Sequence, residues 1–317
     1  MNTLYLTHRV ALAHDMGAGH PERPDRLRAI EARLAADSFD RLIRQQAPLA
    51  GREAILRVHP EGHLRFLEEL SPARGLARID GDTAMNSETL EAALRAAGGA
   101  VEAVDSVMAG RADNAFLAMR PPGHHAERMT AMGFCFLNNA AIAARHAQAV
   151  HGVKRVAIMD FDVHHGNGTQ DIFWSDHSVL YASTHQAPLY PGTGAASECG
   201  EFDTIVNAPL RAGDGGEAFR DAMENVVLPR IDAFQPDFLI LSAGFDAHRR
   251  DPLANLNLEA EDFAWATRQL MELADRHAGG RLVSVLEGGY DLEGLAASVA
   301  AHVTALMGEA LIPPQRE

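Results

Sequence analysis

A short apolar run that ends in acids and histidines constrains this chain more than any other stretch. Residues 156–159 read VAIM, and DFDVHH follows at 160–165. An apolar run of this length between polar residues is typical of a buried strand in a parallel sheet. Alternation along that strand would place Asp160, Asp162 and His164 on one face. Because buried carboxylates are costly without a partner or a cation, this face predicts a metal site; the alternative is that the acids only cap the next helix.

Apolar strands alternate with helical segments along the whole chain. Further strands are expected at 3–7, 114–119, 178–184, 238–242 and 282–286, with less regular strand segments at 40–56 and 202–206. Helices are expected at 24–36, 60–70, 88–109, 137–150, 216–234, 259–277 and 292–307. Such alternation predicts an α/β fold, in which helices cover both faces of a parallel sheet. No repeat or long linker divides the chain, so we expect one domain.

Composition excludes several classes of function. The net charge of −15 argues against a broad nucleic-acid surface, which needs a basic patch. Two cysteines, Cys135 and Cys199, cannot form a disulfide framework, and they fit a reducing cytoplasm. No apolar run approaches the roughly 18 residues of a membrane span, and the N-terminus has no signal-peptide pattern. A phosphate-binding glycine motif is also missing from the sequence, so we expect neither ATP nor NAD.

Unusual polar residues follow four of the expected strands: His124 and His125, Asp162 and His164, Asp246, and Tyr290. In open α/β sheets, ligands bind beyond the carboxyl ends of the strands, so we expect these side chains to meet there. Asp162, His164 and Asp246 would supply three metal ligands and leave a coordination position open, as catalytic zinc requires. An imidazole can transfer the proton of water, and a tyrosine hydroxyl can stabilise an oxyanion. The chemistry predicted is metal-assisted amide hydrolysis.

Six motifs carry a resemblance to a known family. They are HDMGAGHPERPDRL (14–27), RPPGHHAERMTAMGFCFLNN (120–139), DFDVHHGNGTQDIF (160–173), YPGTGAA (190–196), SAGFDAHRRDPL (242–253) and LEGGYDL (286–292). The chain resembles the histone deacetylase superfamily of arginase-like fold, and most closely its class II branch with the bacterial relatives. The resemblance implies a single catalytic domain over 1–317, built on a parallel sheet of about eight strands.

The resemblance also implies roles for the polar residues. Asp162, His164 and Asp246 are expected to bind Zn²⁺, although the choice of Zn²⁺ or iron in vivo stays open. His125 is expected to be the general base and acid, and Tyr290 to stabilise the tetrahedral intermediate. The three residues that complete this set are His124 as the electrostatic partner of His125, Asp160 as the carboxylate that pairs with His124, and Asn167. The last stands where class II enzymes carry asparagine.

A channel for an acyl-lysine stem is implied as well. Phe134, which follows Gly133, and Tyr190 match its aromatic walls; the alternative for both is ordinary core packing. Arg23 matches an arginine that lines the acetate exit cavity. Leu253 stands where the polyamine-selective relative carries a glutamate. The family commonly binds two potassium ions. The positions that match are Asp160, Asp162, His164, Ser183 and Thr184 for the first and Phe173, Asp176, Val179 and Thr204 for the second.

The expected substrates are acetyl-lysine in a peptide or protein, or a small acetylated amine. An acetylpolyamine amidohydrolase of the same mechanism is the main alternative, and Leu253 speaks against it. A two-manganese ureohydrolase would need acids where Asn167 and His248 stand. A non-catalytic acyl-lysine binder would be expected to lack Tyr290 or one histidine of the pair. The sequence leaves open the physiological substrate, the acyl chain length and whether the protein forms a homo-oligomer.

Overall fold

The structure is a computed structural model that describes residues 1–310. Its centre is an eight-stranded parallel sheet in the order β2-β1-β5-β10-β9-β6-β7-β8. The strands are β1 (Thr3–Thr7), β2 (Ile43–Gln46), β5 (Asn114–Leu117), β6 (Val156–Asp160), β7 (Val179–Gln186), β8 (Ile205–Leu210), β9 (Phe238–Ala243) and β10 (Leu282–Leu286). A separate antiparallel pair, β3 (Ala77–Arg78) and β4 (Ala84–Met85), lies outside this sheet.

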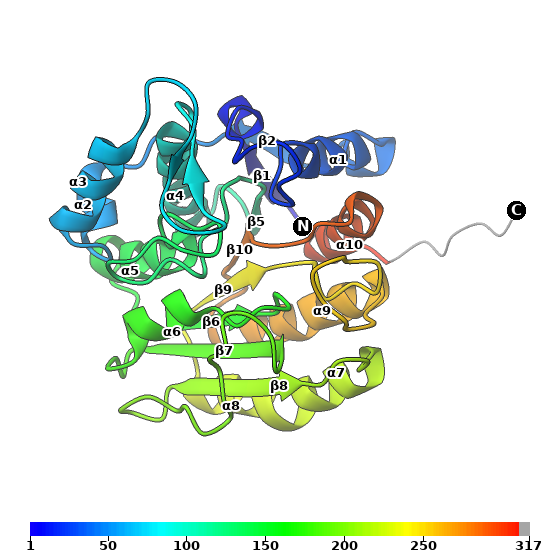
Figure 1. The fold of residues 1–317 in the computed structure, drawn as a ribbon. Coiled ribbons are helices and arrows are strands. Elements are labelled where there is room, and N and C mark those ends of the chain that lie inside the picture. Colours follow the sequence, from blue (N-terminus) through cyan, green and yellow to red (C-terminus); the bar gives the residue numbers. More distant parts are fainter. Residues whose placement is uncertain (311–317) are drawn as a thin grey trace, which may run out of the picture.

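Helices cover both faces of the sheet (Figure 1). The main ones are α1 (Asp25–Arg33), α4 (Thr89–Met108), α5 (Asn139–His151), α9 (Ala260–His277) and α10 (Leu292–Leu306). The shorter ones are α2 (Arg52–Leu56), α3 (Glu61–Leu70), α6 (Asn167–Phe173), α7 (Gly216–Ala222) and α8 (Leu228–Phe234), with 3₁₀ turns at Arg9–Leu12 and Asp37–Phe39 and a π-helical turn at Met223–Val227. Helices α1, α10 and α9 pack in a row, whereas α4 packs on α5. Among residues 1–310, none of the helices combines the length and apolarity that crossing a membrane would require.

The predicted fold class is confirmed, and the differences are local. Alternation had predicted that Asp160, Asp162 and His164 share one face of a strand. Strand β6 ends at Asp160, so Asp162 and His164 lie in the loop beyond it. The segment 52–56, expected to be part of an irregular strand region, is the helix α2. The predicted helix 216–234 contains a π-helical turn between α7 and α8.

A buried histidine in the core makes a prediction about acid stability. His302 of α10 has no solvent exposure, and its ring nitrogens lie 2.7 Å from Thr267 Oγ1 and 2.9 Å from Ser284 Oγ. Burial lowers the pKa of His302 to about 3. Between about pH 6.5 and pH 3, the unfolded chain therefore binds a proton at His302 that the folded chain does not bind. The free energy of unfolding decreases as the pH is lowered across this window.

We expect His302→Gln to reduce the slope of unfolding free energy against pH below 6.5, by up to about 1.4 kcal/mol per pH unit. Urea unfolding of both proteins at several pH values measures this slope. The comparison must be of slopes, because the substitution also changes packing and shifts both curves vertically. Parallel curves for the two proteins would show that His302 does not contribute to acid sensitivity.

Candidate active site

Four neighbouring strands bring the predicted site residues together. Strands β5, β10, β9 and β6 are adjacent in the sheet and parallel, so the loops at their carboxyl ends share one edge. These loops carry His124 and His125 after β5, Asp162 and His164 after β6, Asp246 after β9, and Tyr290 after β10. The sheet order, which the sequence does not give, thus places the four polar loops next to one another.

Two carboxylates and one imidazole converge in the middle of this edge. His164 Nδ1 lies 3.1 Å from Asp162 Oδ1 and 3.1 Å from Asp246 Oδ2. All three side chains are buried. Backbone N–H groups fix both acids: Gly288 N donates to Asp162 Oδ2 at 2.7 Å, and Val163 N donates to Asp246 Oδ1 at 2.8 Å. The protein's own backbone therefore holds the two carboxylates beside the His164 imidazole.

Two glycines make room for the acids. A Cβ atom at Gly288 would lie 2.0 Å from Asp246 Oδ2, and one at Gly244 would lie 2.0 Å from Asp162 Oδ2. Both distances are far below a van der Waals contact, so any side chain at either position would displace a carboxylate. This close approach gives the glycines of the SAGFD and LEGGY motifs a physical reason.

The electrostatics of this group call for a cation. Burial raises the pKa of Asp246, and the charge of Asp162 adds to the effect. Burial also opposes ionisation of Asp162, but the His124 and His164 rings hold the pKa of its carboxyl below the usual range. His164 lies between the two carboxylates, which raise its pKa to about 10 against the opposing effect of burial. Buried acids at this separation and a site that favours positive charge fit a divalent metal ion with mixed oxygen and nitrogen ligands.

The histidine pair beside this group is split into two charge states. His124 Nδ1 lies 2.9 Å from Asp160 Oδ2, which also accepts the Tyr181 hydroxyl at 3.1 Å. Burial works against the charged ring, but Asp160 and Asp162 raise the pKa of His124 well above 6.5. Burial, together with the charge of His124, lowers the pKa of His125 well below 6.5. These shifts favour an imidazolium at His124 and a neutral imidazole at His125.

The tautomer of His125 follows from its neighbours. Its Nδ1 lies 2.8 Å from Asn167 Oδ1, and Asn167 Nδ2 donates to Glu127 Oε1 at 2.9 Å. Because Glu127 is an acceptor, the amide presents its oxygen to His125, and Nδ1 must carry the proton. The Nε2 atom is left with a free lone pair, which is what a general base requires.

A cavity of about 220 Å³ reaches these residues. Its lining contains His125, Gly133, Phe134, His164, Tyr190, Leu253 and Tyr290, with Asp82 and Leu189 at positions that the sequence analysis had not singled out. Gly133 and Phe134 both have positive φ, 56° and 69°. This conformation is uncommon for phenylalanine and is typical of residues that a functional site holds in place. The Tyr190 ring lies 5.1 Å from the His125 ring, centre to centre.

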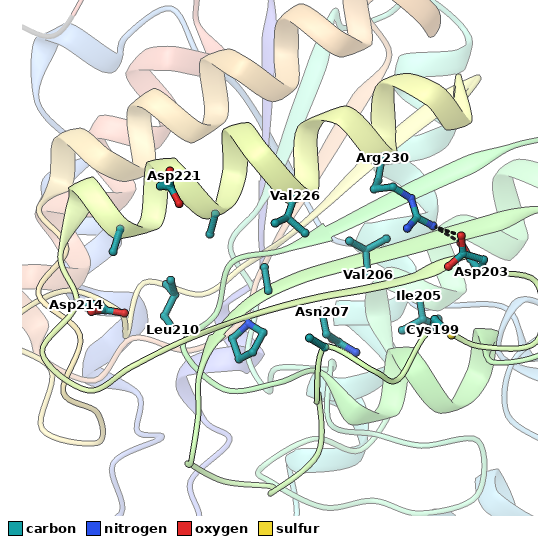
Figure 2. Close-up of a pocket in the computed structure, with 15 residues that line it drawn as sticks. Cys199, Asp203, Ile205, Val206, Asn207, Leu210, Asp214, Asp221, Val226 and Arg230 are labelled. Carbon is teal, nitrogen blue, oxygen red and sulfur yellow. Dashed lines mark hydrogen bonds and ion pairs between the residues drawn. The ribbon is translucent and has the colours of Figure 1, made fainter.

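A larger cavity, of about 490 Å³, lies elsewhere, between the edge strand β8 and the helices from α7 to α8 (Figure 2). Asp203 in its lining is paired with Arg230, and Asp214 accepts a backbone bond from Arg211. Figure 2 shows Asp203 and Asp214 at opposite ends of this cavity. Among the described residues that line it there is no histidine. The candidate active site is therefore assigned to the smaller cavity, where the predicted histidines and tyrosines gather, and not to the cavity of larger volume.

Comparison with known proteins decides the family. The sequence profile of the histone deacetylase domain matches residues 20–306. The chain belongs to this family. A probable deacetylase from Archaeoglobus fulgidus is 41% identical over 300 residues, which are 93% of this chain and 83% of that protein. A histone deacetylase-like amidohydrolase from Pseudomonas aeruginosa is 43% identical over 86% of this chain and 73% of its own length.

A solved structure agrees with these sequences. The crystal structure of the HDA15 HD domain is 41% identical, with a TM-score of 0.92 over 99% of this chain and 90% of that one. The resemblance drawn from the six motifs is thereby confirmed. Relatives named deacetylase and amidohydrolase place this histone deacetylase family member among the hydrolases.

The expectation for Arg23 is wrong. Its side chain is about half exposed and pairs with Asp25, so it lines no internal cavity. The neighbouring arginine of the same motif, Arg26, is fully buried, and its guanidinium carbon lies 4.8 Å above the centre of the Tyr290 ring. Arg26 Nε also donates to the carbonyl of Gly289 at 2.6 Å. Helix α1 begins at Asp25, and Arg26, one position into the helix, lies on its buried side together with Leu27 and Ile30.

The potassium positions lie on and beside strand β7. Ser183 is in register with Asp160 of the neighbouring strand, and Thr184 follows it. Phe173 ends α6, and its carbonyl accepts the N–H of Asp176 at 3.1 Å. The Asp176 carboxylate is paired with Arg145, and its backbone oxygen accepts the Thr204 hydroxyl at 2.9 Å. Any ion near Asp176 would therefore need backbone oxygens, because the side chain is already neutralised.

Asp251 is a residue that sequence reasoning missed. Its buried carboxylate accepts the N–H of Tyr290 at 2.7 Å and the N–H of Leu253 at 3.0 Å. Burial raises the pKa of Asp251 to about 7. A single carboxylate thus holds in place two residues that line the cavity. The only signal in the sequence was its position in the DPL triplet.

Removing this carboxylate should slow turnover of acetylated substrates without emptying the metal site. Because a misplacement of about 1 Å at a reacting group can cost 10²-fold in rate, we expect Asp251→Ala to lower kcat by about 10- to 100-fold. Steady-state kinetics with metal content measured in parallel tests this. Asp291→Ala is the matched control, since Asp291 caps α10 through Gly294 N and does not hold Tyr290. Unchanged kcat in Asp251→Ala would contradict the positioning role.

Proposed function

We propose that this protein is a zinc-dependent deacetylase that hydrolyses the amide of acetyl-lysine side chains. One observation carries the proposal: the buried group of Asp162, His164 and Asp246 reaches a cavity through His164, and His125, with a free Nε2, lines the same cavity. A metal-ligand set and a neutral base at one cavity are the two parts that hydrolysis of an unactivated amide needs.

Each residue has a distinct part in the proposed reaction. Zn²⁺ held by Asp162, His164 and Asp246 would supply Lewis acidity to the scissile carbonyl and lower the pKa of water. His125 takes the proton of the attacking water on Nε2, while Asn167 holds the Nδ1 proton in place. His125 then returns that proton to the departing lysine amine.

The remaining charges support the reacting groups. His124, charged and paired with Asp160, keeps positive charge beside the reacting carbonyl. Tyr290 donates its hydroxyl to the oxygen that becomes negative when the carbonyl is attacked. Asn167 and Glu127 leave His125 with an amide partner and no direct carboxylate, which supports the class II assignment and keeps the ring less basic.

The lining of the cavity supports the proposal that it binds the methylene chain of an acyl-lysine. Phe134, Tyr190 and Leu253 present apolar or aromatic surface, which suits the four methylenes of lysine. A polyamine carries a further cationic nitrogen along its chain, and burial of that charge beside Leu253 would be unfavourable. Acetylpolyamine hydrolysis is the alternative that Asp82 in the lining would favour, because its carboxylate could receive a cation.

Two further proposals concern the scaffold. We place both implied K⁺ ions along β7, one beside Asp160 and Ser183 and one beside Phe173 and Val179, where backbone oxygens would be the main ligands. We also propose that the whole chain forms one catalytic domain, in the cytoplasm. Metal analysis by mass spectrometry after dialysis against sodium or potassium buffers would test the first of these.

The test of the function compares two substrates on metal-depleted and zinc-restored protein. We expect zinc-dependent release of acetate from an acetyl-lysine peptide, and much slower release from N-acetylputrescine. Leu253→Glu should move this preference toward N-acetylputrescine, because the new carboxylate can pair with the free amine. Preference of the unmodified protein for N-acetylputrescine would overturn the substrate assignment, and absence of turnover on both substrates with zinc bound would overturn the activity.

A further inference from the structure

A second group of metal-ligating side chains lies far from the active site. Asp105 is in the last turn of α4, His151 is the last residue of α5, and His146 is one turn and a half earlier. The chain enters β5 and β6 from the ends of these two helices, so the group lies at the amino ends of the strands. The active site lies at the opposite, carboxyl ends. The proposed deacetylase mechanism does not use any of the three residues.

The geometry of the group is that of three ligands around one point. Asp105 Oδ1 lies 2.7 Å from His146 Nε2 and 2.6 Å from His151 Nε2. The two imidazole rings are 5.6 Å apart and inclined by 70°, so their Nε2 atoms approach Asp105 from different directions. The His146 side chain is 9% exposed, that of His151 22% and that of Asp105 34%. The group is thus partly buried, with one side open to water.

The surroundings favour a cation at this point. Both α4 and α5 end here, and the carboxyl end of a helix carries partial negative charge that stabilises nearby cations. Helices α4 and α5 pack against each other, so their ends are held at a fixed separation. The Asp105 carboxylate adds negative charge at the same point. Cationic side chains oppose this: Arg57 Nη1 lies 3.2 Å from His146 Nδ1, and Lys154 and Arg281 line a cavity together with His151.

We propose that Asp105, His146 and His151 form a second binding site for a divalent transition-metal ion such as Zn²⁺. Two imidazoles and a carboxylate are ligands that Zn²⁺, Co²⁺ and Ni²⁺ accept, and water on the open side completes the coordination. Tetrahedral coordination at about 2.1 Å separates ligand atoms by about 3.4 Å, so small rotations of the side chains suffice. The ion would join the ends of α4 and α5.

Binding requires a change of tautomer at His146. Arg57 donates to Nδ1, so in the metal-free ring the proton is on Nε2 and points at Asp105. A metal ion takes the Nε2 lone pair, and the proton moves to Nδ1, where it would face the arginine donor. Arg57 must then turn away, which it can do while its Nη2 stays paired with Glu53 at 2.9 Å. The structure therefore predicts that Arg57 weakens the site.

Arg57→Gln is consequently expected to tighten metal binding. A glutamine carbonyl could accept the Nδ1–H bond, as second-sphere partners of metal-bound histidines commonly do, and the charge repulsion would be lost. Such partners are worth about 10- to 100-fold in affinity, which is the size of the gain we expect. This variant changes a partly buried side chain that is not one of the three ligands, so it tests the site without removing a ligand.

The main test counts Zn²⁺ ions by isothermal titration of the full chain. We expect His151→Gln and His146→Gln each to bind one equivalent fewer than the unmodified protein, while deacetylation is unchanged. His277→Gln is the matched control: His277 also contacts an aspartate, Asp232, at 2.8 Å, but as a single histidine. Asp246→Asn removes an active-site ligand, so this variant should bind Zn²⁺ at the second site alone. Adding His151→Gln to it should abolish this remaining Zn²⁺ binding.

The outcomes separate this proposal from the deacetylase proposal. If the unmodified protein and His151→Gln bound the same number of Zn²⁺ ions, the second site would be overturned, whether or not the protein is a deacetylase. The three residues would then only form hydrogen bonds between α4 and α5. Loss of one equivalent in His151→Gln without any deacetylase activity in the unmodified protein would support the second site and overturn the function. Unchanged affinity in Arg57→Gln would contradict the tautomer argument.

Discussion

Tyr290→Phe is expected to lower kcat on an acetyl-lysine peptide by about 10²- to 10³-fold, the usual effect of removing one oxyanion donor. The reason is specific to the hydroxyl. Burial raises the pKa of Tyr290 well above 10, so the group keeps its proton and can donate it in a hydrogen bond. The phenylalanine ring would retain the contact with Phe134, at 5.9 Å between ring centres, and the place beneath Arg26. Thermal stability and KM should therefore change little, and kcat should carry the effect.

The chain offers a matched control in Tyr190→Phe. Tyr190 lines the same cavity and faces His125, but it is 39% exposed. We expect this variant to retain most of the kcat of the unmodified protein. Steady-state kinetics on the peptide, with zinc content verified, distinguishes the two tyrosines. If Tyr290→Phe retained full kcat, the oxyanion role would have to be reassigned, with the charged His124 as the next donor.

The fold was predictable in those elements where burial imposes a regular pattern of apolar residues on the sequence. Strand β10 was predicted at its observed bounds because five apolar or small residues lie between two helices. The bounds of the edge strand β2 were not predicted, because its sequence, IRQQ, is exposed and lacks the apolar pattern of a buried strand. Helix α2 was missed for a related reason: five residues are too few to show a helical period. Edge and short elements depend on tertiary contacts that the local sequence does not reveal.

The site was predictable in its ligands and not in its supports. Asp162, His164 and Asp246 attract attention because acids and imidazoles are unusual at the ends of apolar strands, and the structure brings them within hydrogen-bonding distance. Their catalytic and metal-binding roles remain predictions. Asp251 lies in a loop and Arg26 at a helix start, where charged residues are ordinary. Their importance comes from contacts with residues 39 and 263 positions away, which no local pattern encodes.

Glu22 is the clearest of these hidden supports, and its replacement is expected to destabilise the whole fold. Its carboxylate has no solvent exposure and lies between two arginines that also have none. Glu22 Oε1 lies 2.9 Å from Arg26 Nη1, and Oε2 lies 2.6 Å from Arg120 Nη2. Although burial opposes its ionisation, Arg120 and Arg26 hold the pKa of Glu22 well below its usual range. One buried anion thus neutralises part of the charge of two buried cations.

Glu22→Gln keeps the shape of the side chain and removes the charge. The new amide would have to point its N–H group at one of two guanidinium donors, and both arginines would stay buried. Since breaking a buried ion pair typically costs 3–5 kcal/mol, we expect a loss of about 3–5 kcal/mol in unfolding free energy at neutral pH. Guanidinium-induced unfolding measures it. Glu61→Gln, which breaks the exposed pair with Arg52, is the control and should leave the unfolding midpoint unchanged.

The pH dependence gives an independent check on this assignment. Because the folded pKa of Glu22 is depressed, its contribution is fully present above the ordinary carboxyl pKa of about 4.5 and is lost as the pH falls toward the folded value. The stability difference between the two proteins should therefore narrow progressively below about pH 4.5. A difference that stayed constant down to pH 3 would assign the loss to altered packing.

The kcat of Glu22→Gln should fall together with its stability, because Arg26 lies over Tyr290. This would link the buried ion network to the proposed oxyanion donor.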